Sequence, residues 1–105
     1  MTVLPLSDEF IPGVLADRKT TTIRRGRRTY GLGEGVLKAG SQDIPIKVNN
    51  VRYCKFRELT EADAFRDGFE SLKQLHDVLR RIYPKLDLDD EVTVVHFERQ
   101  QPART

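Results

Sequence analysis

The highest concentration of chemically active side chains in the sequence lies between residues 18 and 28. Six cations and no acid occur there, and the cations are Arg18, Lys19, Arg24, Arg25, Arg27 and Arg28. Three consecutive threonines and an isoleucine separate the first two cations from the others. Because β-branched side chains favour an extended backbone, we expect a short strand of hydroxyl groups with cations at both ends. Such a surface is suited to phosphates, carboxylates or polar bases.

The later cations of this segment and a nearby tyrosine are candidates for ligand contact. These candidates are Arg24, Arg25, Arg27, Arg28 and Tyr30. A guanidinium group can grip a phosphate or a carboxylate through two parallel hydrogen bonds, and a tyrosine in a glycine-rich loop can stack on an unpaired base. Each pattern also has a structural explanation. The arginines can pair with the acidic residues between positions 58 and 70, and the tyrosine can pack against the fold.

Length and composition indicate one soluble domain without disulfides. At 105 residues the chain is long enough to bury one hydrophobic core. Its net charge of +2 is too small for bulk charge to indicate nucleic acid, so that argument depends on the local basic segment. The single cysteine, Cys54, excludes an intramolecular disulfide and a zinc site of several cysteines. We see no leader peptide and no apolar run of roughly 20 residues, so we expect a cytoplasmic protein that does not enter a membrane.

The order of the expected elements indicates an α+β domain built on a small, mostly antiparallel β-barrel with short helices at its ends. The pattern predicts helices over residues 10–16, 60–68 and 71–83, and strands over residues 20–24, 36–39, 44–59 and 91–98. In the longest strand the apolar alternation changes phase at Asn49 and Asn50, which predicts a bulge there. We also expect turn structure after Leu4, a glycine-rich loop over residues 25–35 and a frayed tail from Arg99.

Taken together, these residues resemble the ASCH family of small domains with a PUA-like barrel. Residues 14–24 are similar to the family's signature, which contains a helix end, a glycine, a lysine and a Thr-x-Arg ending. Residues 67–69 are similar to its acidic-Gly-Phe element, and residues 94–97 to its closing strand. The resemblance is strongest over residues 10–98 and implies that residues 1–105 form a single ASCH domain.

The resemblance also implies a function. ASCH domains are proposed RNA-binding modules, and some bacterial members remove the acetyl group of N(4)-acetylcytidine. We therefore expect a basic cleft for RNA or a nucleoside-like molecule, without a cofactor or a metal. For the hydrolases the resemblance implies a working set of lysine, threonine and acid, which falls on Lys19, Thr22 and Asp67. In such a reaction the lysine would serve as base for the threonine nucleophile, and the acid would orient these groups or protonate the leaving amine.

Two positions depart from the family pattern, and one spacing raises a geometric question. Asp17 stands where the signature has glycine, and Asp67 is one methylene shorter than the glutamate of the hydrolases. Lys19 and Thr22 are three residues apart, so a regular strand would place them on opposite faces. They can converge only if the strand begins after Lys19. An acid at the end of a helix also needs a compensating partner, for which Lys19 or an arginine is expected.

Three classes of function stay open on the sequence. The chain could bind RNA or a nucleoside-like ligand, hydrolyse an acetylated nucleoside, or act as a protein-interaction adaptor. Lys19 and Thr22 are also ordinary choices for the start and the interior of a strand. A ribonuclease has no support from a histidine pair or an acidic metal cluster. His76 and His96 are isolated and are expected to pack rather than to bind metal, and Cys54 is expected to be an inert buried thiol.

Overall fold

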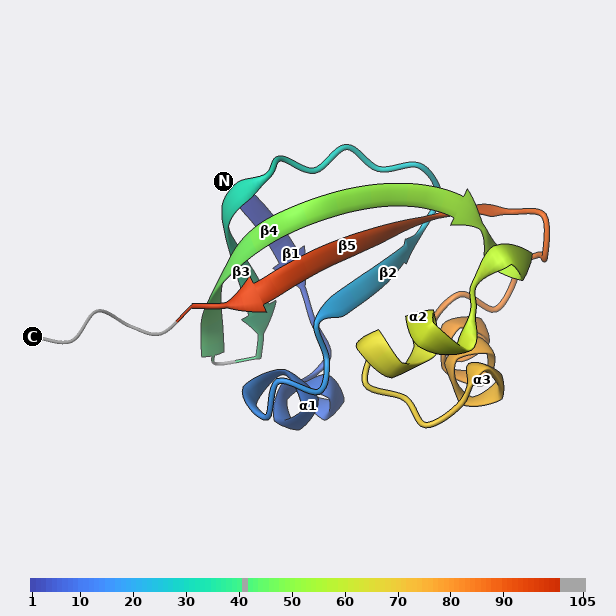
Figure 1. Ribbon diagram of the computed structural model, residues 1–105, viewed down its shortest axis with the longest axis horizontal. Helices are drawn as coiled ribbons and strands as arrows, with labels where there is room; N and C mark the ends of the chain where they lie inside the picture. Colours follow the sequence, from blue (N-terminus) through green and yellow to red (C-terminus); the bar gives the residue numbers. More distant parts are fainter. Residues whose placement is uncertain (41, 101–105) are drawn as a thin grey trace, which may run out of the picture.

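A curled five-stranded sheet forms the centre of the computed structural model, which describes residues 1–40 and 42–100 (Figure 1). The strands follow the order β1-β3-β4-β5-β2, and only β1 and β3 pair in parallel. Their bounds are β1 (Thr2–Pro5), β2 (Thr21–Arg25), β3 (Gly33–Ala39), β4 (Gln42–Lys55) and β5 (Glu91–Arg99). The sheet is curled, but its edge strands β1 and β2 do not pair with each other, so it forms a half-barrel rather than a closed barrel. This architecture confirms the expected α+β fold with a small, mostly antiparallel barrel-like sheet.

The first strand was not predicted, and it extends one residue into the segment after Leu4 where we expected turn structure. Residues Thr2 to Pro5 pair with β3, and Leu4 is fully buried between exposed neighbours. A Cβ atom at Gly35 would lie 2.9 Å from the carbonyl oxygen of Thr2, so the lack of a side chain there allows the two strands to approach. Four residues that include a proline give a weak strand pattern. Their partner strand also lies far along the chain, which explains why the sequence did not indicate β1.

The long strand β4 is the element that curls the sheet. Before the bend, Ile44, Ile46 and Val48 are buried in alternation with exposed residues. The register of β4 against β5 then shifts between Val48 and Asn50, which confirms the bulge predicted at Asn49 and Asn50. An extra residue in one strand bends the strand and increases its local twist. The bulge therefore lets one strand pair with both β3 and β5 around the arch.

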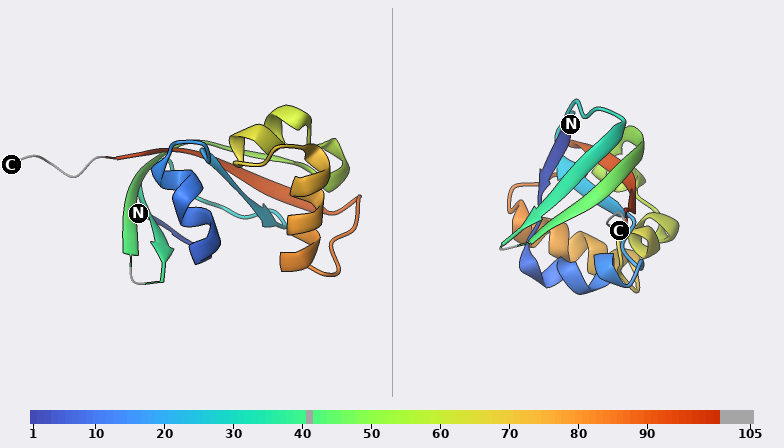
Figure 2. Two further views of the ribbon diagram at one scale, coloured as in Figure 1. Left: turned by 90° about the horizontal axis from the view of Figure 1, so that it is seen from below. Right: turned by 90° about the vertical axis from the view of Figure 1, so that its left-hand side faces the viewer.

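Short helices connect the strands and lie beneath the arch of the sheet in Figure 1 and in the right-hand view of Figure 2. They are the 3-10 helices η1 (Asp8–Phe10) and η2 (Phe56–Glu58) and the α-helices α1 (Ile11–Leu15), α2 (Glu61–Arg66) and α3 (Leu72–Ile82). These bounds confirm the three expected helical regions, and each α-helix begins one residue later and ends one or two residues earlier than expected. Thr60 and Ser71 begin α2 and α3 through side-chain oxygens that accept backbone N–H groups. Among the described residues, no helix is long and apolar enough to cross a membrane.

The hydrophobic core has two parts, which β5 separates. The first part fills the space between the sheet and helices α2 and α3, and it includes Phe56, Leu75 and Val94. The second part fills the curl of the sheet and includes Leu37 and Val95. Val94 and Val95 are neighbours in β5, and successive side chains of a strand point to opposite faces. One strand therefore contributes to both parts, and it fixes the helices relative to the curled sheet.

Candidate ligand pocket beside the second strand

A pocket of about 380 Å³ opens beside β2. Its walls come from the segment after β1, the start of β2, the end of α2 and one side of α3. Its polar lining consists of Ser7, Lys19, Thr22, Arg24 and Asp67. Aromatic and aliphatic side chains form the rest, among them Phe10, Phe69, Leu79, Ile82 and Tyr83. A concave site with mainly apolar walls and a few converging polar groups is the usual form of a small-ligand site.

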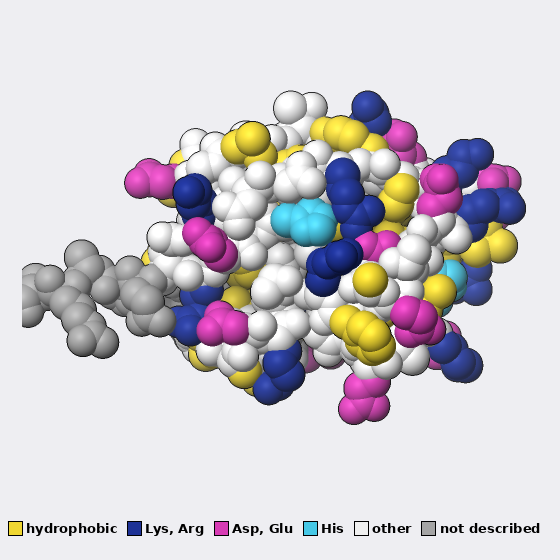
Figure 3. Space-filling model, in the orientation of Figure 1, with side chains coloured by type: hydrophobic (Ala, Val, Ile, Leu, Met, Phe, Trp, Pro, Cys, Tyr) yellow, Lys and Arg dark blue, Asp and Glu magenta, His cyan; other side chains and the backbone are white. Residues whose placement is uncertain are grey.

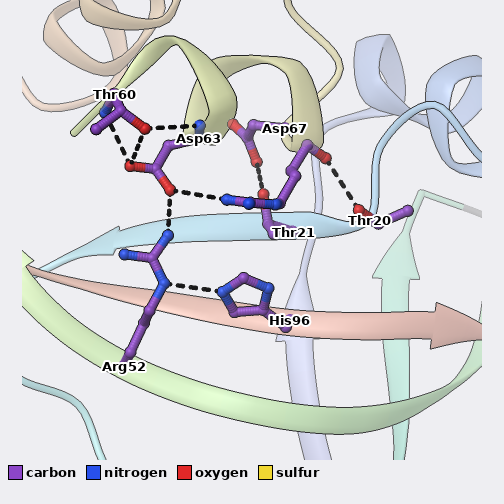
Figure 4. Close-up of polar contacts among 8 residues, drawn as sticks. Thr20, Thr21, Arg52, Thr60, Asp63, Asp67 and His96 are labelled. Atoms are coloured by element: carbon purple, nitrogen blue, oxygen red, sulfur yellow. Dashed lines mark hydrogen bonds and ion pairs between the residues drawn. The ribbon is translucent and has the colours of Figure 1, made fainter.

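The polar centre of this pocket is a buried ion pair. The Nζ atom of Lys19 lies 2.7 Å from Oδ1 of Asp67, and each residue is only 5% exposed. The Thr21 hydroxyl donates a further hydrogen bond of 3.1 Å to the same carboxylate oxygen (Figure 4). Both bonds reach Oδ1, so Oδ2 has no hydrogen-bond partner among the residues that the structure describes. The carboxylate therefore keeps one oxygen with which to accept a hydrogen bond from a ligand.

The connection between α1 and β2 brings Lys19 to this position. Asp17 adopts a positive φ of 58°, and the next two backbone N–H groups both donate to the Gly13 carbonyl oxygen. Lys19 then forms an isolated antiparallel bridge with Asp67, and regular β2 begins only at Thr21. Lys19 therefore precedes the regular strand, which is the condition under which it can converge with Thr22. Both side chains line the same pocket.

Arg24 joins the pocket to the other edge of the half-barrel. Its Nε atom donates to the Thr22 hydroxyl oxygen at 3.1 Å, and one terminal nitrogen donates to the Pro5 carbonyl oxygen at 2.6 Å. The second bond connects β2 with the end of β1 across the open side of the sheet. Because the Thr22 oxygen accepts from Arg24, its own proton stays available for donation to a ligand or to a base.

Burial controls the electrostatics of the pocket. It raises the pKa of the Asp67 carboxyl, while the charge and hydrogen bond of Lys19, the hydroxyl of Thr21 and the charge of Arg24 oppose the shift. The Lys19 ammonium also lies 5.3 Å from the centre of the Phe10 ring, and Phe10 meets Phe69 edge to face at 6.3 Å between ring centres. Charges among such apolar neighbours interact more strongly than charges in water. A polar ligand that displaces water here would consequently experience strong electrostatic interactions.

The other cations of the basic segment lie outside this pocket. Arg25 pairs with Asp90, and Arg27 pairs with Glu91, each at 3.3 Å and with both side chains substantially exposed. The Nε atom of Arg28 donates to the backbone oxygen of Arg25 at 3.0 Å. The structure therefore divides the expected cationic cluster, because Lys19 and Arg24 are the members of it that line the pocket. Arg25 and Arg27 instead fold back onto the acids Asp90 and Glu91 where β5 begins.

Tyr30 also lies away from the pocket. Its half-buried ring packs against the part of the core inside the curl, and it borders a separate cavity with Thr2 and Leu32. The structure thus brings together Lys19 and Asp67 with Thr22 and Arg24, while Tyr30 and the three exposed arginines stay apart from them.

Sequence reasoning did not identify several residues of the pocket. Thr21 holds the carboxylate of Asp67, although the threonine run alone could not show which hydroxyl faces which side of β2. Phe10 and Tyr83 reach the pocket from distant parts of the chain. Phe69 and Tyr83 had a usable signal, because both belong to segments that resemble the acidic-Gly-Phe element and the following helix of the family. The described residues contain no group of three or more His, Cys, Asp or Glu side chains placed to hold a metal ion.

Comparison with known proteins supports the fold and leaves the ligand open. No family model and no curated protein matches the sequence. Among solved structures, the ASCH domain from Lactobacillus crispatus JV V101 superposes with a TM-score of 0.77 at 16% identity and covers 93% of this chain and 79% of its own. A protein from Enterococcus faecalis V583 with the family description DUF984 gives a TM-score of 0.79 at 16% identity over 95% and 76% of the two chains.

A third structure, a point mutant of ZmASCH from Zymomonas mobilis, gives a TM-score of 0.67 at 20% identity and covers 97% of this chain and 71% of its own. Identities this low demonstrate a shared fold rather than a shared activity. The protein therefore has the fold of the ASCH domains. This result confirms the fold that the sequence resemblance implied.

Proposed function

We propose that the pocket binds a nucleoside-like group, either as a free molecule or as an unpaired base of an RNA. The observation that carries the proposal is the buried pair of Lys19 and Asp67 beside Thr22 and Arg24 in a pocket of about 380 Å³. The aromatic and aliphatic walls suit the faces of a planar ring. The polar floor offers donors and one free carboxylate oxygen for the edge of that ring.

The proposal rests on the pocket rather than on a broad basic surface. Arg25 and Arg27 are already paired with acids, so an extended cationic track for an RNA backbone would have to break those exposed pairs. Exposed pairs are weak, and their rearrangement would cost little. An RNA ligand would therefore place one unpaired base in the pocket while its backbone competes for these arginines.

The test is a calorimetric titration of the full chain with cytidine, N(4)-acetylcytidine and a short unpaired RNA. We expect saturable binding of at least one of them and about tenfold weaker binding by an Arg24→Gln variant, because a charge-assisted contact and the support of Thr22 are lost. Arg57→Gln is the matched control, since Arg57 is an exposed arginine paired with Asp89 away from the pocket. No binding of any ligand, or equal effects of the two substitutions, would contradict the proposal.

A second candidate function is hydrolysis of an acetylated nucleoside. It is favoured by the placement of Lys19, Thr22 and Asp67 on one pocket, where Arg24 also orients the Thr22 oxygen. In this reaction the Thr22 oxygen would attack the acyl carbon and lose its proton to a neighbouring base. The C–N bond would break as the amine leaves with a proton, and water would then hydrolyse the threonine ester to release acetate.

Turnover distinguishes the hydrolase from a binding domain. The pure protein is incubated with N(4)-acetylcytidine, and the release of cytidine is followed by chromatography beside Thr22→Ala and Thr22→Ser variants. A hydrolase should lose turnover with alanine and retain part of it with serine, because serine keeps the hydroxyl nucleophile. Absence of cytidine after long incubation, or turnover that persists in Thr22→Ala, would rule out this mechanism for this substrate.

A further inference from the structure

A second group of charged side chains lies where α2 meets β4 and β5 (Figure 4). Its centre is Asp63, a carboxylate that is 5% exposed. Arg52 and Arg66 both donate to Oδ1 of this carboxylate, the latter at 3.3 Å, and the backbone N–H of Thr60 donates to Oδ2 at 2.8 Å. One buried acid from α2 thus holds two guanidinium groups, one from β4 and one from its own helix.

His96 on β5 completes this group. Its Nε2 atom accepts a hydrogen bond of 2.9 Å from Nε of Arg52. A guanidinium group can only donate, so the imidazole must be neutral at Nε2 and carry its proton on Nδ1. The burial of His96, followed by the charges of Arg52 and Arg66, lowers the pKa of the imidazole, whereas Asp63 opposes the shift. His96 therefore presents a neutral ring with one N–H donor.

Some donors of this group remain without a partner. Within the described part of the chain, neither Nδ1 of His96 nor the second terminal nitrogen of Arg66 makes a hydrogen bond. The Nδ1 atom of His96 is not among the buried unpaired atoms there, so it reaches solvent. The side chains of Arg52 and Arg66 are 33% and 48% exposed. Three elements consequently offer N–H donors around one place on the surface.

The charge of the group favours an anion. Two guanidinium groups face a single carboxylate, and that carboxylate is buried beneath them. Burial opposes its ionisation, but the hydrogen bonds from Thr60 and the charge of Arg52 lower the pKa of Asp63 overall, which keeps it ionised. The outward side is therefore positive. The space-filling view shows a histidine in the middle of one face with two basic side chains beside it (Figure 3).

We propose that Arg52, Arg66 and His96 form a binding site for a phosphate group, separate from the pocket. Guanidinium groups bind phosphate through directional, charge-assisted hydrogen bonds, and Asp63 holds both of them in place before the anion arrives. Such preorganisation reduces the entropy that is lost on binding. The site uses none of the side chains that line the pocket, so it does not depend on the proposed nucleoside ligand.

The phosphate site and the pocket are neighbours in the structure. The Arg66 carbonyl oxygen accepts from the Thr20 N–H at 2.7 Å, and Asp67 follows Arg66 directly in the chain. His96 lies opposite Thr21 in the pairing of β5 with β2. The shared chemistry of the ligand is a phosphate ester, whose source is either a free nucleotide or the backbone of an RNA.

The first experiment titrates the full chain with inorganic phosphate and follows arginine side-chain and backbone N–H signals by two-dimensional NMR. We expect saturable shifts at Arg52, Arg66 and His96, and about fivefold weaker binding by Arg66→Gln. This variant is preferred because Arg52 still compensates the buried Asp63. The control is Arg57→Gln, which removes an equally exposed arginine from a different ion pair and should change the affinity by no more than about twofold. Unsaturable shifts, or equal losses in both variants, would overturn the proposal.

The second experiment identifies the source of the phosphate. A nucleoside 5′-monophosphate, the matching nucleoside and a short unpaired RNA are titrated into the wild type and Arg66→Gln. A loss confined to the RNA assigns the site to an RNA backbone, and a loss with both phosphorylated ligands assigns it to the phosphate of a nucleotide. If Arg66→Gln weakens the nucleoside as much as the others, a distinct phosphate site is refuted. Arg24→Gln should leave the inorganic phosphate titration unchanged, so failure of the pocket proposal can be recognised separately.

Discussion

The charges of Lys19 and Asp67 are both removed from water, and each is compensated mainly by the other. Their atoms meet at 2.7 Å, and both side chains are nearly inaccessible. A buried pair of this kind gains little over two apolar residues, but it becomes costly when one partner is removed, because an uncompensated charge then stays buried. The presence of such a pair in the wall of a pocket is therefore better explained by a role in binding a ligand than by a contribution to the stability of the fold.

Replacement of Asp67 by asparagine should expose this cost. The side chain keeps its shape but loses its charge, so the Lys19 ammonium is left buried without a counter-charge. We expect the free energy of unfolding to fall by about 3 kcal/mol, measured by urea denaturation. The matched control is Asp77→Asn on α3, which makes the same chemical change in an exposed pair with Lys73 and should leave the midpoint almost unchanged. Similar effects of the two substitutions would show that the Lys19 charge is not dependent on Asp67.

The imidazole of His96 should titrate below its usual pKa of 6.5 in the folded protein. Burial and the charges of Arg52 and Arg66 disfavour the imidazolium, so between the folded and unfolded pKa values the unfolded chain binds a proton that the folded chain does not. The free energy of unfolding contributed by His96 therefore decreases as the pH falls below 6.5. An NMR titration should show the His96 pKa moving upward in Arg66→Gln. An unchanged pKa would mean that Arg66 does not face the ring.

The short connection between α1 and β2 and the end of α2 work together to position these side chains. Asp17 has a φ of 58°, in the left-handed region, and the chain then turns so that Lys19 bridges Asp67. Aspartate tolerates this conformation better than most residues with a side chain. Gly68, the residue after Asp67, has a φ of 88° and packs directly against Cα and Cβ of Lys19. The departure at Asp17 is thus accommodated by the backbone without loss of the turn.

Gly68→Ala tests this close approach. A Cβ atom at Gly68 would lie 3.3 Å from Cβ of Lys19, and the positive φ adds strain of about 1 kcal/mol. Gly26→Ala is the control, because Gly26 has a similar φ of 85° but no atom within 4 Å of its Cβ position. Both variants should be destabilised in thermal unfolding, but only Gly68→Ala should also weaken binding in the pocket. Equal binding by the two variants would indicate that Lys19 can move without consequence.

Across the molecule, the two parts of the core have different relations to the pocket. The part beneath the sheet fixes α3, whose Leu79 and Ile82, together with Tyr83 directly after the helix, form one wall of the pocket. The part inside the curl fixes β1, β3 and β4, with Leu37 at its centre. Damage to either part should destabilise the whole domain, since β5 belongs to both. Only damage beneath the sheet should displace the wall that α3 supplies.

Leu75→Ala and Leu37→Ala make this distinction measurable. Both leucines are fully buried, so each truncation should cost about 3 kcal/mol of unfolding free energy in denaturant titrations. At a temperature where both variants stay folded, Leu75→Ala should reduce affinity for the pocket ligand and Leu37→Ala should not. A loss of affinity in Leu37→Ala alone would show that the curl of the sheet, rather than α3, shapes the pocket.

Local patterns in the sequence were sufficient to predict most of the secondary structure. The β-branched run from Thr20 predicted β2, the caps at Thr60 and Ser71 predicted the start of two helices, and the phase change at Asn49 predicted the bulge in β4. Each signal depends on the preferences of residues that are adjacent or a few positions apart. β1 escaped prediction because its strand character depends on a partner far along the chain.

The sequence by itself thus determined the α+β elements other than β1, their order and the concentration of cations before and after the threonine run. Only the tertiary structure decided which of those cations share a pocket. Lys19 meets Asp67 across 48 positions, and Arg25 and Arg27 are drawn instead to Asp90 and Glu91 at the start of β5. Secondary structure could be predicted because propensity, capping and alternation depend on residues close together in the chain. The partner of a charge could not, because the burial and compensation of a charge depend on which elements pack together in the folded protein. Residue types therefore predicted the chemistry, and docking of α2 against β2 selected the residues that line the pocket.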